Sequence, residues 1–392
     1  MAENPLKIVY VTPALYLAGG MERVVTLKAN YFADCFGYDV TIIITEGKGK
    51  PYFYPLSDKI KVVNLDINFE KQWNCGLLKR ILIYIPKQIK FKKLLTKELF
   101  RIRPDITISM LRREINFIND IKDGSRKIGE IHINRANYRN FKSDNENCLK
   151  RLFAKYWSHS LLGHLRKLDS LVVLTDKDRE AWTELNNVVT IPDPLPFTPT
   201  KSSLQTEKRV IAIARYSYEK GIDLLLQAWA EVERQCEDWR LDVFGDGDTS
   251  SYEHLIDNLG IDRNRCGLNA RTNDVEREYC NSSIFALSSR FEGFGMVMIE
   301  AMACGLPVVA FNCPWGPQEI VNNGEDGILV DNGSSSSLAN GLLQLINDVN
   351  TRKAMSEAAE RNVLRFKIDY IAQEWKKLFE EFNINKEPNE NL

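Results

Sequence analysis

The stretch that decides the fold is SSIFALSSRFEGFGMVMIEAMACGLPVVAF, residues 282–311. It begins with a short apolar run, passes through a glycine-rich loop and an apolar segment at helical spacing, and resumes after Gly305 with a second apolar run. A glycine that ends a helix between two such runs predicts a strand, a loop, a helix and a second strand. Strands joined through a helix lie parallel, so this stretch predicts an α/β fold on a parallel sheet.

The same alternation extends through both halves of the chain. Short apolar runs occur before the middle of the chain as KIVYV, DVTIIIT, KVVNL, DITISM, KIGEI and SLVVL, and after it as RVIAIA, RLDVFG, SIFALSS, LPVVAF and DGILV. Helical patterns separate most of them, which is typical of a parallel sheet covered on both faces. Four prolines in residues 192–199 oppose both helix and central strand. We therefore predict two doubly wound α/β domains joined by a linker there.

Composition excludes several classes of protein. With 52 basic and 53 acidic residues, the chain has no overall charge that favours nucleic acid as a partner. Its eight cysteines contain no CxxC pair and its four histidines lie apart from them, which predicts neither a zinc site nor a disulfide framework. No basic leader with an apolar core and no apolar run of about 18 residues is present. We expect a cytoplasmic protein that does not span a membrane.

Open α/β sheets bind ligands at the carboxyl ends of their strands, so the loops after strands carry the functional information. In KIVYVTPALYLAGGMERVV, residues 7–25, Gly19 and Gly20 come just before a helix. Bare amides at a helix N-terminus favour phosphate or another anion. A simple tight turn explains the two glycines equally well, and the residues leave both readings open.

A second loop, in IAIARYSYEKG at residues 211–221, follows a strand with two cations. Arg215 comes directly after the strand and Lys220 precedes the next helix. Two cations beside a helix N-terminus can neutralise a diphosphate and stabilise it as a leaving group. The alternative is a pair of solvated surface charges.

The third loop lies in the opening stretch, where EGFGMVMIE places Glu292 before a glycine-rich turn and Glu300 on the following helix. Two separated carboxylates suit two parts of one hydroxyl-rich ligand, such as a transferred sugar and a ribose. Glycines let the backbone approach a ligand closely, and amides at the helix start can donate to it. The candidate ligand-binding positions of this turn are Gly293, Phe294, Gly295, Met296 and Val297.

Together these residues resemble the retaining, nucleotide-sugar-dependent glycosyltransferases of family 4, which have the GT-B fold of two Rossmann-like domains facing a cleft. The resemblance covers nearly the whole chain. It rests on the Glu292 to Glu300 motif with EAMACGLPVVAF, on Arg215 with Lys220, on VFGDGD at 243–248 and on AGGMERV near the start. We place the N-terminal, acceptor-side domain at 1–192, with a C-terminal helix at about 368–385 packing back on it, and the nucleotide-sugar domain at 201–367.

The resemblance implies a role for each motif. The counterparts of Arg215 and Lys220 bind the diphosphate, that of Glu292 approaches the donor sugar, and that of Glu300 holds the ribose. The family carries a histidine that contacts the donor sugar in the region of His132, in KIGEIHINRANY. A structural hydrogen-bonding role for His132 stays open. The chain departs from the family pattern at two places. Ala214 stands where the family often has glycine, and CPWGPQEIV replaces the commoner Gly-Gly-x-Pro-Glu. The resemblance therefore assigns no residue roles to the phosphate loop at 312–319.

The implied activity is that of a hexosyltransferase-type glycosyltransferase (EC 2.4). It would move a sugar from a nucleoside diphosphate sugar, with UDP favoured over GDP, to a saccharide or lipid-linked saccharide in surface glycan synthesis. The resemblance implies no metal and no cofactor besides this co-substrate. Asp246 and Asp248 formally match a metal-binding Asp-x-Asp but lie in the second domain. A sugar-nucleotide epimerase and a catalytically silent carbohydrate-binding scaffold are the alternatives, whereas no GxGxxG follows a strand to indicate a dehydrogenase.

One further segment bears on partners, GLLKRILIYIPKQIKFKKLLTKELFRIR at 76–103. It holds nine basic residues and one acidic residue, Glu98. An apolar stripe at helical spacing runs beside the charges, made of Leu77, Leu78, Ile81, Leu82, Ile85 and Ile89. Such a helix can lie on an anionic surface on the inner face of the cytoplasmic membrane. Alternatively, the stripe packs on the first domain's sheet and the lysines are solvated, and Pro86 interrupts the helix.

Overall fold

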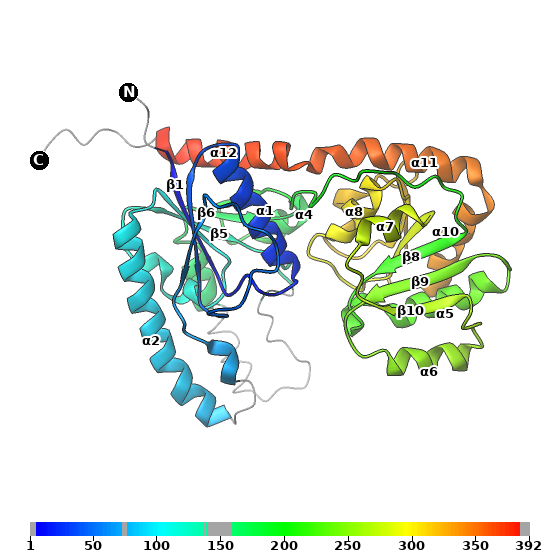
Figure 1. Ribbon diagram of the computed structural model, residues 1–392, viewed down its shortest axis with the longest axis horizontal. Coiled ribbons are helices and arrows are strands. Elements are labelled where there is room, and N and C mark those ends of the chain that lie inside the picture. Colours follow the sequence, from blue (N-terminus) through cyan, green and yellow to red (C-terminus); the bar gives the residue numbers. More distant parts are fainter. Residues whose placement is uncertain (1–4, 73–76, 137, 139–158, 385–392) are drawn as a thin grey trace, which may run out of the picture. The chain divides into compact units, whose positions relative to one another are not determined.

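A computed structural model describes residues 5–72, 77–136, 138 and 159–384, which form two compact units (Figure 1). The N-terminal unit comprises Met1–Pro194 together with Ile368–Leu392, and the C-terminal unit comprises Leu195–Lys367. The chain thus leaves the first unit within the proline-rich stretch and returns to it for its last helix.

The N-terminal unit is built on a parallel sheet, in which the described residues form seven strands in the order β3-β2-β1-β4-β5-β6-β7. Side chains alternate across it, so that Ile8 and Tyr10 of the first strand face one side while Val9 and Val11 face the other. The strands are β1 (Lys7–Thr12), β2 (Asp39–Ile44), β3 (Lys61–Asn64), β4 (Ile106–Ser109), β5 (Arg126–Glu130), β6 (Ser170–Val173) and β7 (Val188–Thr190).

Helices cover both faces of this sheet. One face is packed by α1 (Gly20–Asp34) and by α12 (Ile368–Ile384), whose Phe379 ring meets Phe32 edge-on at 5.6 Å (Figure 1). The other face is packed by α2 (Leu77–Ile102), which runs through Pro86 without the interruption that the sequence predicted. The shorter elements are α4 (Asp176–Ala181) and the 3-10 turns η1 (Phe69–Gln72), η2 (Glu114–Asn116) and η3 (Ile118–Asp120).

The C-terminal unit repeats the plan with a sheet in which the described residues form six parallel strands, in the order β10-β9-β8-β11-β12-β13. Its main core lies between the sheet and α5, where Trp229 is fully buried. The strands are β8 (Arg209–Ile213), β9 (Arg240–Gly245), β10 (Cys266–Ala270), β11 (Ile284–Leu287), β12 (Val308–Phe311) and β13 (Gly327–Val330). The helices are α5 (Ile222–Glu233), α6 (Ser250–Leu259), α7 (Val275–Cys280), α8 (Met296–Ala303), α9 (Pro317–Ile320), α10 (Ser335–Asn347) and α11 (Val349–Asn362), with η4 (Tyr218–Lys220) and η5 (Val363–Phe366).

The predicted pair of doubly wound parallel-sheet domains is confirmed, with two strands that the sequence did not reveal. Both β7 and β10 are edge strands, and their sequences VVT and CGLNA lack the apolar runs of buried strands. The six cysteines among the described residues are free thiols. None of the helices in the described part of the chain is long and apolar enough to cross a membrane.

The strand orders place a topological switch point in each sheet. In the N-terminal sheet the chain runs outward through β2 and β3 and then returns to lay β4 beside β1. In the C-terminal sheet it runs outward through β9 and β10 and then returns to lay β11 beside β8. The loops after β8 and β11 carry the cations and the glutamate motif, so the fold brings these motifs to one switch point, where open α/β sheets bind ligands.

Candidate functional site

Lys220 and Glu292 meet at the switch point of the C-terminal sheet. The Lys220 Nζ donates to Glu292 Oε1 at 2.7 Å, and the Ser289 hydroxyl donates to the same oxygen at 2.6 Å. The Glu292 side chain is 8% exposed and that of Lys220 is 21% exposed. Because two donors hold the carboxylate, its position is fixed before any ligand arrives.

Further contacts clamp the two loops together. Arg290 binds both carboxylate oxygens of Asp223, at 2.9 and 2.6 Å, and its backbone N–H donates to the Glu219 carbonyl. The Ser288 hydroxyl donates to the Lys220 carbonyl at 3.0 Å. Bidentate arginine pairs fix orientation as well as distance. The loop after β8 is therefore held in register with the loop after β11.

The tight approach of these loops requires a glycine at position 221. Gly221 has a φ of +61°, and a Cβ built on it would lie 2.1 Å from the Ser288 carbonyl oxygen. It is also the N-cap residue of α5, where no side chain caps the helix. The positive end of that helix consequently lies directly beside Lys220, an arrangement that favours an anion.

Arg215 lies apart from the ion pair between Lys220 and Glu292. Its side chain is 69% exposed, and Nη2 contacts Glu219 Oε1 at 2.9 Å. Burial raises the pKa of Glu219, but hydrogen bonds from its own amide and from Ser217, together with the charge of Arg215, lower it further than burial raises it. The two predicted cations are thus on one loop, and each is matched to a different carboxylate.

The glycine-rich turn leads directly into α8. Gly293 and Phe294 form a bend, and Gly295, with a φ of +103°, precedes the first helical residue, Met296. The Phe294 ring is buried and meets Phe366 edge-on at 5.5 Å. Because the Phe294 side chain is buried and the two flanking residues are glycines, the turn exposes backbone groups and no large side chain.

The segment after β12 closes over this turn. A Cβ on Gly316 would lie 2.3 Å from the Phe294 carbonyl oxygen, so the two backbones are in direct contact. Burial, and then the nearby charge of Glu292, raise the pKa of the Cys313 thiol to about 12. Cys313 is therefore a neutral neighbour of the carboxylate and not a nucleophile.

Glu300 lies on α8 and is 3% exposed. The Tyr279 hydroxyl lies 3.3 Å from Glu300 Oε2 and 3.4 Å from the carbonyl oxygen of Val297. Glu292 and Glu300 are thus both buried carboxylates of the C-terminal unit.

The competing Asp246 and Asp248 motif has a structural use. The Asp248 carboxylate accepts from the Ser250 amide at 3.0 Å and from its hydroxyl at 2.6 Å, at the start of α6. The hydroxyl bond, followed by the amide bond, lowers the pKa of Asp248. Asp246 is 66% exposed and 3.9 Å from Arg271. Among the residues that the structure describes, the group of three side chains close enough together to hold a metal ion lies in the N-terminal unit and does not include Asp246 or Asp248.

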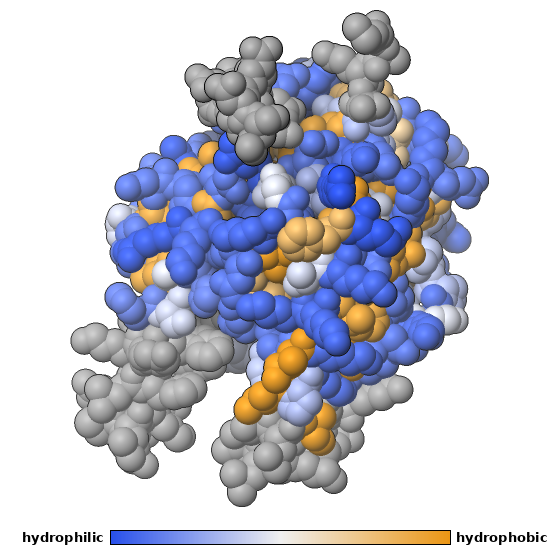
Figure 2. Space-filling view, turned by 90° about the vertical axis from the view of Figure 1, so that its left-hand side faces the viewer, coloured by the Kyte–Doolittle hydropathy of each residue, from blue (hydrophilic) through white to orange (hydrophobic). Residues whose placement is uncertain are grey.

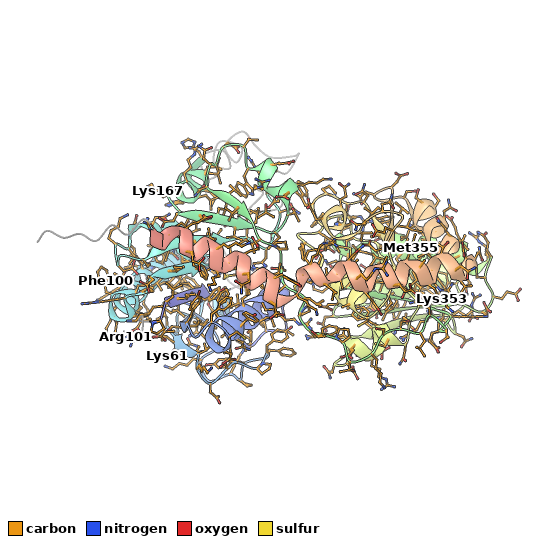
Figure 3. The ribbon with its side chains drawn as sticks, turned by 90° about the horizontal axis from the view of Figure 1, so that it is seen from above. Lys61, Phe100, Arg101, Lys167, Lys353 and Met355 are labelled. Atoms are coloured by element: carbon orange, nitrogen blue, oxygen red, sulfur yellow. The ribbon has the colours of Figure 1, made fainter. Side chains whose placement is uncertain are left out.

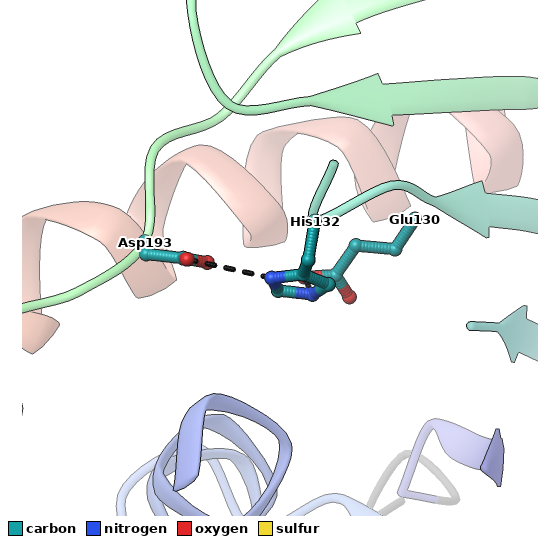
Figure 4. Close-up of side chains that lie close together, drawn as sticks. All are labelled: Glu130, His132 and Asp193. Carbon is teal, nitrogen blue, oxygen red and sulfur yellow. Dashed lines mark hydrogen bonds and ion pairs between the residues drawn. The ribbon is translucent and has the colours of Figure 1, made fainter. Parts of the chain in front are cut away.

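That group is a buried cluster in the N-terminal unit, which the sequence analysis did not anticipate apart from His132. His132 Nε2 lies 3.0 Å from Glu130 Oε1, an ion-pair distance, and Nδ1 lies 3.4 Å from Asp193 Oδ2 (Figure 4). Lys28 contacts the same oxygen of Glu130, and its Nζ lies 4.3 Å over the Trp375 ring. The sequence did contain one signal of this cluster, because Lys28 is a charged residue within the otherwise apolar stripe of the first helix.

Two of these groups have strongly shifted pKa values. Burial raises the pKa of Glu130, but attraction to Lys28 and then His132 outweighs it and lowers the value to about 2. Burial lowers the pKa of His132, but attraction to Asp193 and then Glu130 raises it to about 9. His132 is therefore an imidazolium at neutral pH.

The cluster fits a proton better than a metal ion. The ligand atoms of Glu130, His132 and Asp193 lie within 4.8 Å of one another, as a metal would require. However, the Lys28 ammonium already contacts the Glu130 oxygen that such an ion would use. Two carboxylates balance the charges of Lys28 and an imidazolium, whereas a divalent ion would leave buried positive charge uncompensated.

Gly19 and Gly20 lie at the N-terminus of α1, as predicted, but a carboxylate of this chain already lies there. A Cβ on Gly19 would lie 2.1 Å from Glu22 Oε2. Burial raises the pKa of Glu22, while its own backbone amide and the charge of Arg112 lower it. An anion approaching the two glycines would therefore meet this carboxylate.

Comparison with known proteins places the chain among sugar-transferring enzymes. A sequence profile described as "Glycosyl transferases group 1" matches residues 197–362. An "Uncharacterized glycosyltransferase" of Haemophilus influenzae is 30% identical over 367 residues, which is 92% of this chain and 96% of that protein. A Campylobacter jejuni protein, named "GalNAc-alpha-(1->4)-GalNAc-alpha-(1->3)-diNAcBac-PP-undecaprenol alpha-1,4-N-acetyl-D-galactosaminyltransferase", is 27% identical over 96% of this chain and 99% of its own.

Among solved structures, a crystal structure of a TarM mutant from S. aureus in complex with fondaparinux, alpha-GlcNAc-glycerol and UDP is similar with a TM-score of 0.75. The match covers 95% of this chain and 99% of TarM at 17% identity. A likeness of this extent at low identity shows a shared fold. The predicted GT-B fold class is thereby confirmed.

Proposed function

Because this chain belongs to the glycosyl transferases group 1 family, we propose that it is a retaining, family 4 hexosyltransferase. In this proposal the donor is a nucleoside diphosphate sugar, with UDP favoured over GDP. The observation that carries the proposal is the ion pair of Lys220 with Glu292 beside the uncapped N-terminus of α5. A diphosphate bound there gains a cation and a helix dipole at once, and both stabilise the charge that develops on the leaving group.

In this proposal each residue has a separate task. Lys220, joined by Arg215 after it leaves Glu219, binds the diphosphate, and Glu292 accepts from hydroxyls of the donor sugar. Glu300 accepts from the ribose, and backbone amides at the start of α8 complete the donor site. His132, in the N-terminal unit, keeps the role that the resemblance implies, a contact with the donor sugar, and its imidazolium would supply a positive charge there.

The proposed reaction uses no metal and no cofactor beyond the nucleotide sugar. Support comes from the structural use of Asp248 as a hydrogen-bond acceptor at the start of α6. A metal-binding role would require that carboxylate to exchange its present partners. Lys220 instead supplies the positive charge that a metal ion would otherwise provide.

We propose a saccharide or lipid-linked saccharide acceptor in surface glycan synthesis. The Campylobacter jejuni relative is named for a substrate carried on PP-undecaprenol, and the TarM complex contains alpha-GlcNAc-glycerol with UDP. These names support an acceptor at a cell surface or in a lipid-linked pathway.

The outer face of α2 supports a membrane location for such an acceptor. Phe91, Leu95 and Leu99 bury the inner face of this helix, whereas Ile85 and Ile89 are 53% and 64% exposed. The expectation that the apolar stripe packs on the sheet is therefore wrong for these two isoleucines. The other four members of the stripe have side chains outside the described residues.

Basic side chains surround these exposed apolar groups. Lys90, Lys93 and Lys97 are exposed on α2, and Phe100 and Arg101 lie at the outer edge of the N-terminal unit (Figure 3). Figure 2 shows this side of the molecule, where apolar patches lie among hydrophilic side chains. Apolar groups beside lysines fit an anionic bilayer surface, where each lysine is worth about 1 kcal/mol.

Co-sedimentation with phosphatidylglycerol vesicles and with neutral phosphatidylcholine vesicles tests the membrane location. Reversal of Lys90, Lys93 and Lys97 to glutamate should weaken binding to the anionic vesicles roughly a hundredfold or more, and high salt should do the same. Lys92 is left intact because it contacts Asp120 at 2.6 Å. Reversal of Lys201, Arg234 and Lys353, three exposed basic residues of the C-terminal unit, is the matched control. Equal losses in both triple variants would contradict the proposal.

Transfer itself is tested with purified full-length protein and a panel of UDP and GDP sugars. A donor that binds the native protein raises its apparent stability, which identifies the base and the sugar. Incubation with donor alone should leave the sugar configuration unchanged. An epimerised nucleotide sugar would refute the proposed transfer.

A further inference from the structure

A cavity of about 410 Å³ opens at the carboxyl ends of β2 and β3 in the N-terminal unit. Its walls include Ile44 and Val62 of the two strands, Asn64, and the loop from Gly47 to Tyr52. Pockets for small ligands have volumes of roughly 300 to 1,000 Å³, so the space is large enough for a ligand and not only for solvent.

The wall of this cavity is held rigidly to the loop after β1. Gly47 has a φ of +72°, and a Cβ on it would lie 2.2 Å from the Tyr16 ring. The Lys50 ammonium lies 3.8 Å over the same ring, and the Tyr16 hydroxyl donates to Glu70 at 2.8 Å. Because the Lys50 ammonium already makes a cation–π contact with Tyr16, only part of its charge remains available to a ligand in the cavity.

The chemistry of the lining favours a neutral, hydroxyl-rich ring. Tyr52 is 45% exposed, and the adjacent Phe53 is 47% exposed. The Asn64 amide is held by the Glu46 carbonyl and the Asp66 amide, and it adds a polar wall. The described residues that line the cavity include no carboxylate. An aromatic face beside amide and ammonium groups suits a sugar, which has an apolar ring face and polar edges.

The position of the cavity determines which sugar it could take. The switch point of this sheet lies between β1 and β4, and the cavity lies at the far edge, between β2 and β3. Neighbouring strands are about 4.8 Å apart, so the cavity is roughly 10 to 15 Å from the switch point. Open α/β sheets bind ligands at the switch point, so we take that point as the place of the reacting hydroxyl. A ring bound in the cavity would then lie too far away to be the reacting one.

We propose that this cavity is an acceptor subsite, which binds a sugar ring that lies further along the acceptor chain than the reacting hydroxyl. The inference rests on the proposed glycosyltransferase function and adds to it the size of the acceptor. The loop after β1 adjoins the far side of this cavity, because the Phe53 amide, next to Tyr52, donates to the Leu15 carbonyl at 2.8 Å. An acceptor of several sugars would extend from that loop to Tyr52.

Calorimetric titration of the full-length protein, saturated with UDP, with maltotriose and with chitotriose tests the subsite. At least one trisaccharide should bind, and Tyr52→Ala should weaken that binding about tenfold or more. Tyr52→Trp, which keeps an aromatic face, should retain the affinity. Tyr370→Ala is the matched control, because Tyr370 is a 60% exposed tyrosine of the same unit on α12.

Three results would overturn the inference. These are wild-type affinity in Tyr52→Ala, absence of binding of either trisaccharide at about 10 mM, and displacement of a bound trisaccharide by inorganic phosphate, which would assign the cavity to an anion. UDP binding is measured in the same samples. Absence of binding of both UDP and GDP by the wild-type protein would refute the proposed function itself, whereas normal nucleotide binding without trisaccharide binding refutes only the subsite.

Discussion

Replacing Asp193 with asparagine should lower the pKa of His132 and reduce the pH dependence of stability above neutrality. Burial alone lowers the pKa of this histidine, and attraction to Asp193, followed by Glu130, raises it to about 9. The asparagine keeps the shape of the side chain but removes its charge. His132 then retains Glu130, which it shares with Lys28, while the burial penalty persists.

The magnitude follows from linkage. The unfolded chain binds this proton with the ordinary pKa of 6.5 and the folded chain with one of about 9, a difference worth about 3 kcal/mol. The folded pKa is the higher one, so this stabilisation is fully present below pH 6.5 and is lost as pH rises to about 9. The charged groups that face the imidazolium are Glu130, Asp193, Lys28 and Glu22. Glu130, with its pKa lowered to about 2, stays ionised throughout that window.

Urea unfolding at several values between pH 6 and 9.5 measures this term. The wild-type protein should lose about 3 kcal/mol over the window, and Asp193→Asn should lose much less. The chain has four histidines, so NMR titration can follow His132 directly. Asp176→Asn, at a 59% exposed aspartate of the same unit, is the control and should follow the wild type. A wild-type His132 that titrates near 6.5 would refute the reasoning.

Three further results are expected. Glu300→Ala should weaken UDP binding by roughly 1.5 to 3 kcal/mol in calorimetry, whereas Glu292→Ala should mainly slow transfer, and equal losses of UDP affinity would contradict this division. Transfer should persist in excess EDTA; its loss, with recovery on addition of manganese, would restore the metal reading of Asp246 and Asp248. Gly221→Ala should destabilise the protein by about 2 kcal/mol or more in urea unfolding. Gly260→Ala should cost less, because Gly260 also has a positive φ but its Cβ would meet no atom within 4 Å.

The fold could be predicted because each buried strand has an apolar run in its own sequence. Strands buried on both faces, such as β2 and β12, must be apolar throughout, so runs like TIII and VVAF identify them locally. Edge strands are under a weaker constraint, because one side of their backbone has no neighbour in the sheet. The CGLNA of β10 accordingly carries no pattern that separates it from a loop.

The candidate donor site could be predicted as a set of residues but not as a set of contacts. The position of Lys220 and Glu292 after strands predicted that both contact the ligand. It did not predict that they contact each other. In the structure they bind each other across 72 positions of sequence. That pairing depends on β11 lying beside β8, and strand order is set by packing between helices and sheet faces, which no local pattern records.

The buried cluster around His132 shows the same limit more sharply. Lys28 is tolerable in the core only because Glu130 neutralises it and Trp375 covers it, and these partners come from β5 and from the last helix of the chain. An isolated buried charge would be prohibitively costly, so each member requires the others. Read along the sequence, Lys28 looks like an interruption of an apolar stripe, and Glu130 looks like a polar residue at the end of a strand. The pairing of Lys28 with Glu130 forms only in the folded N-terminal unit, because α12 must pack on α1 before Trp375 can cover the ammonium.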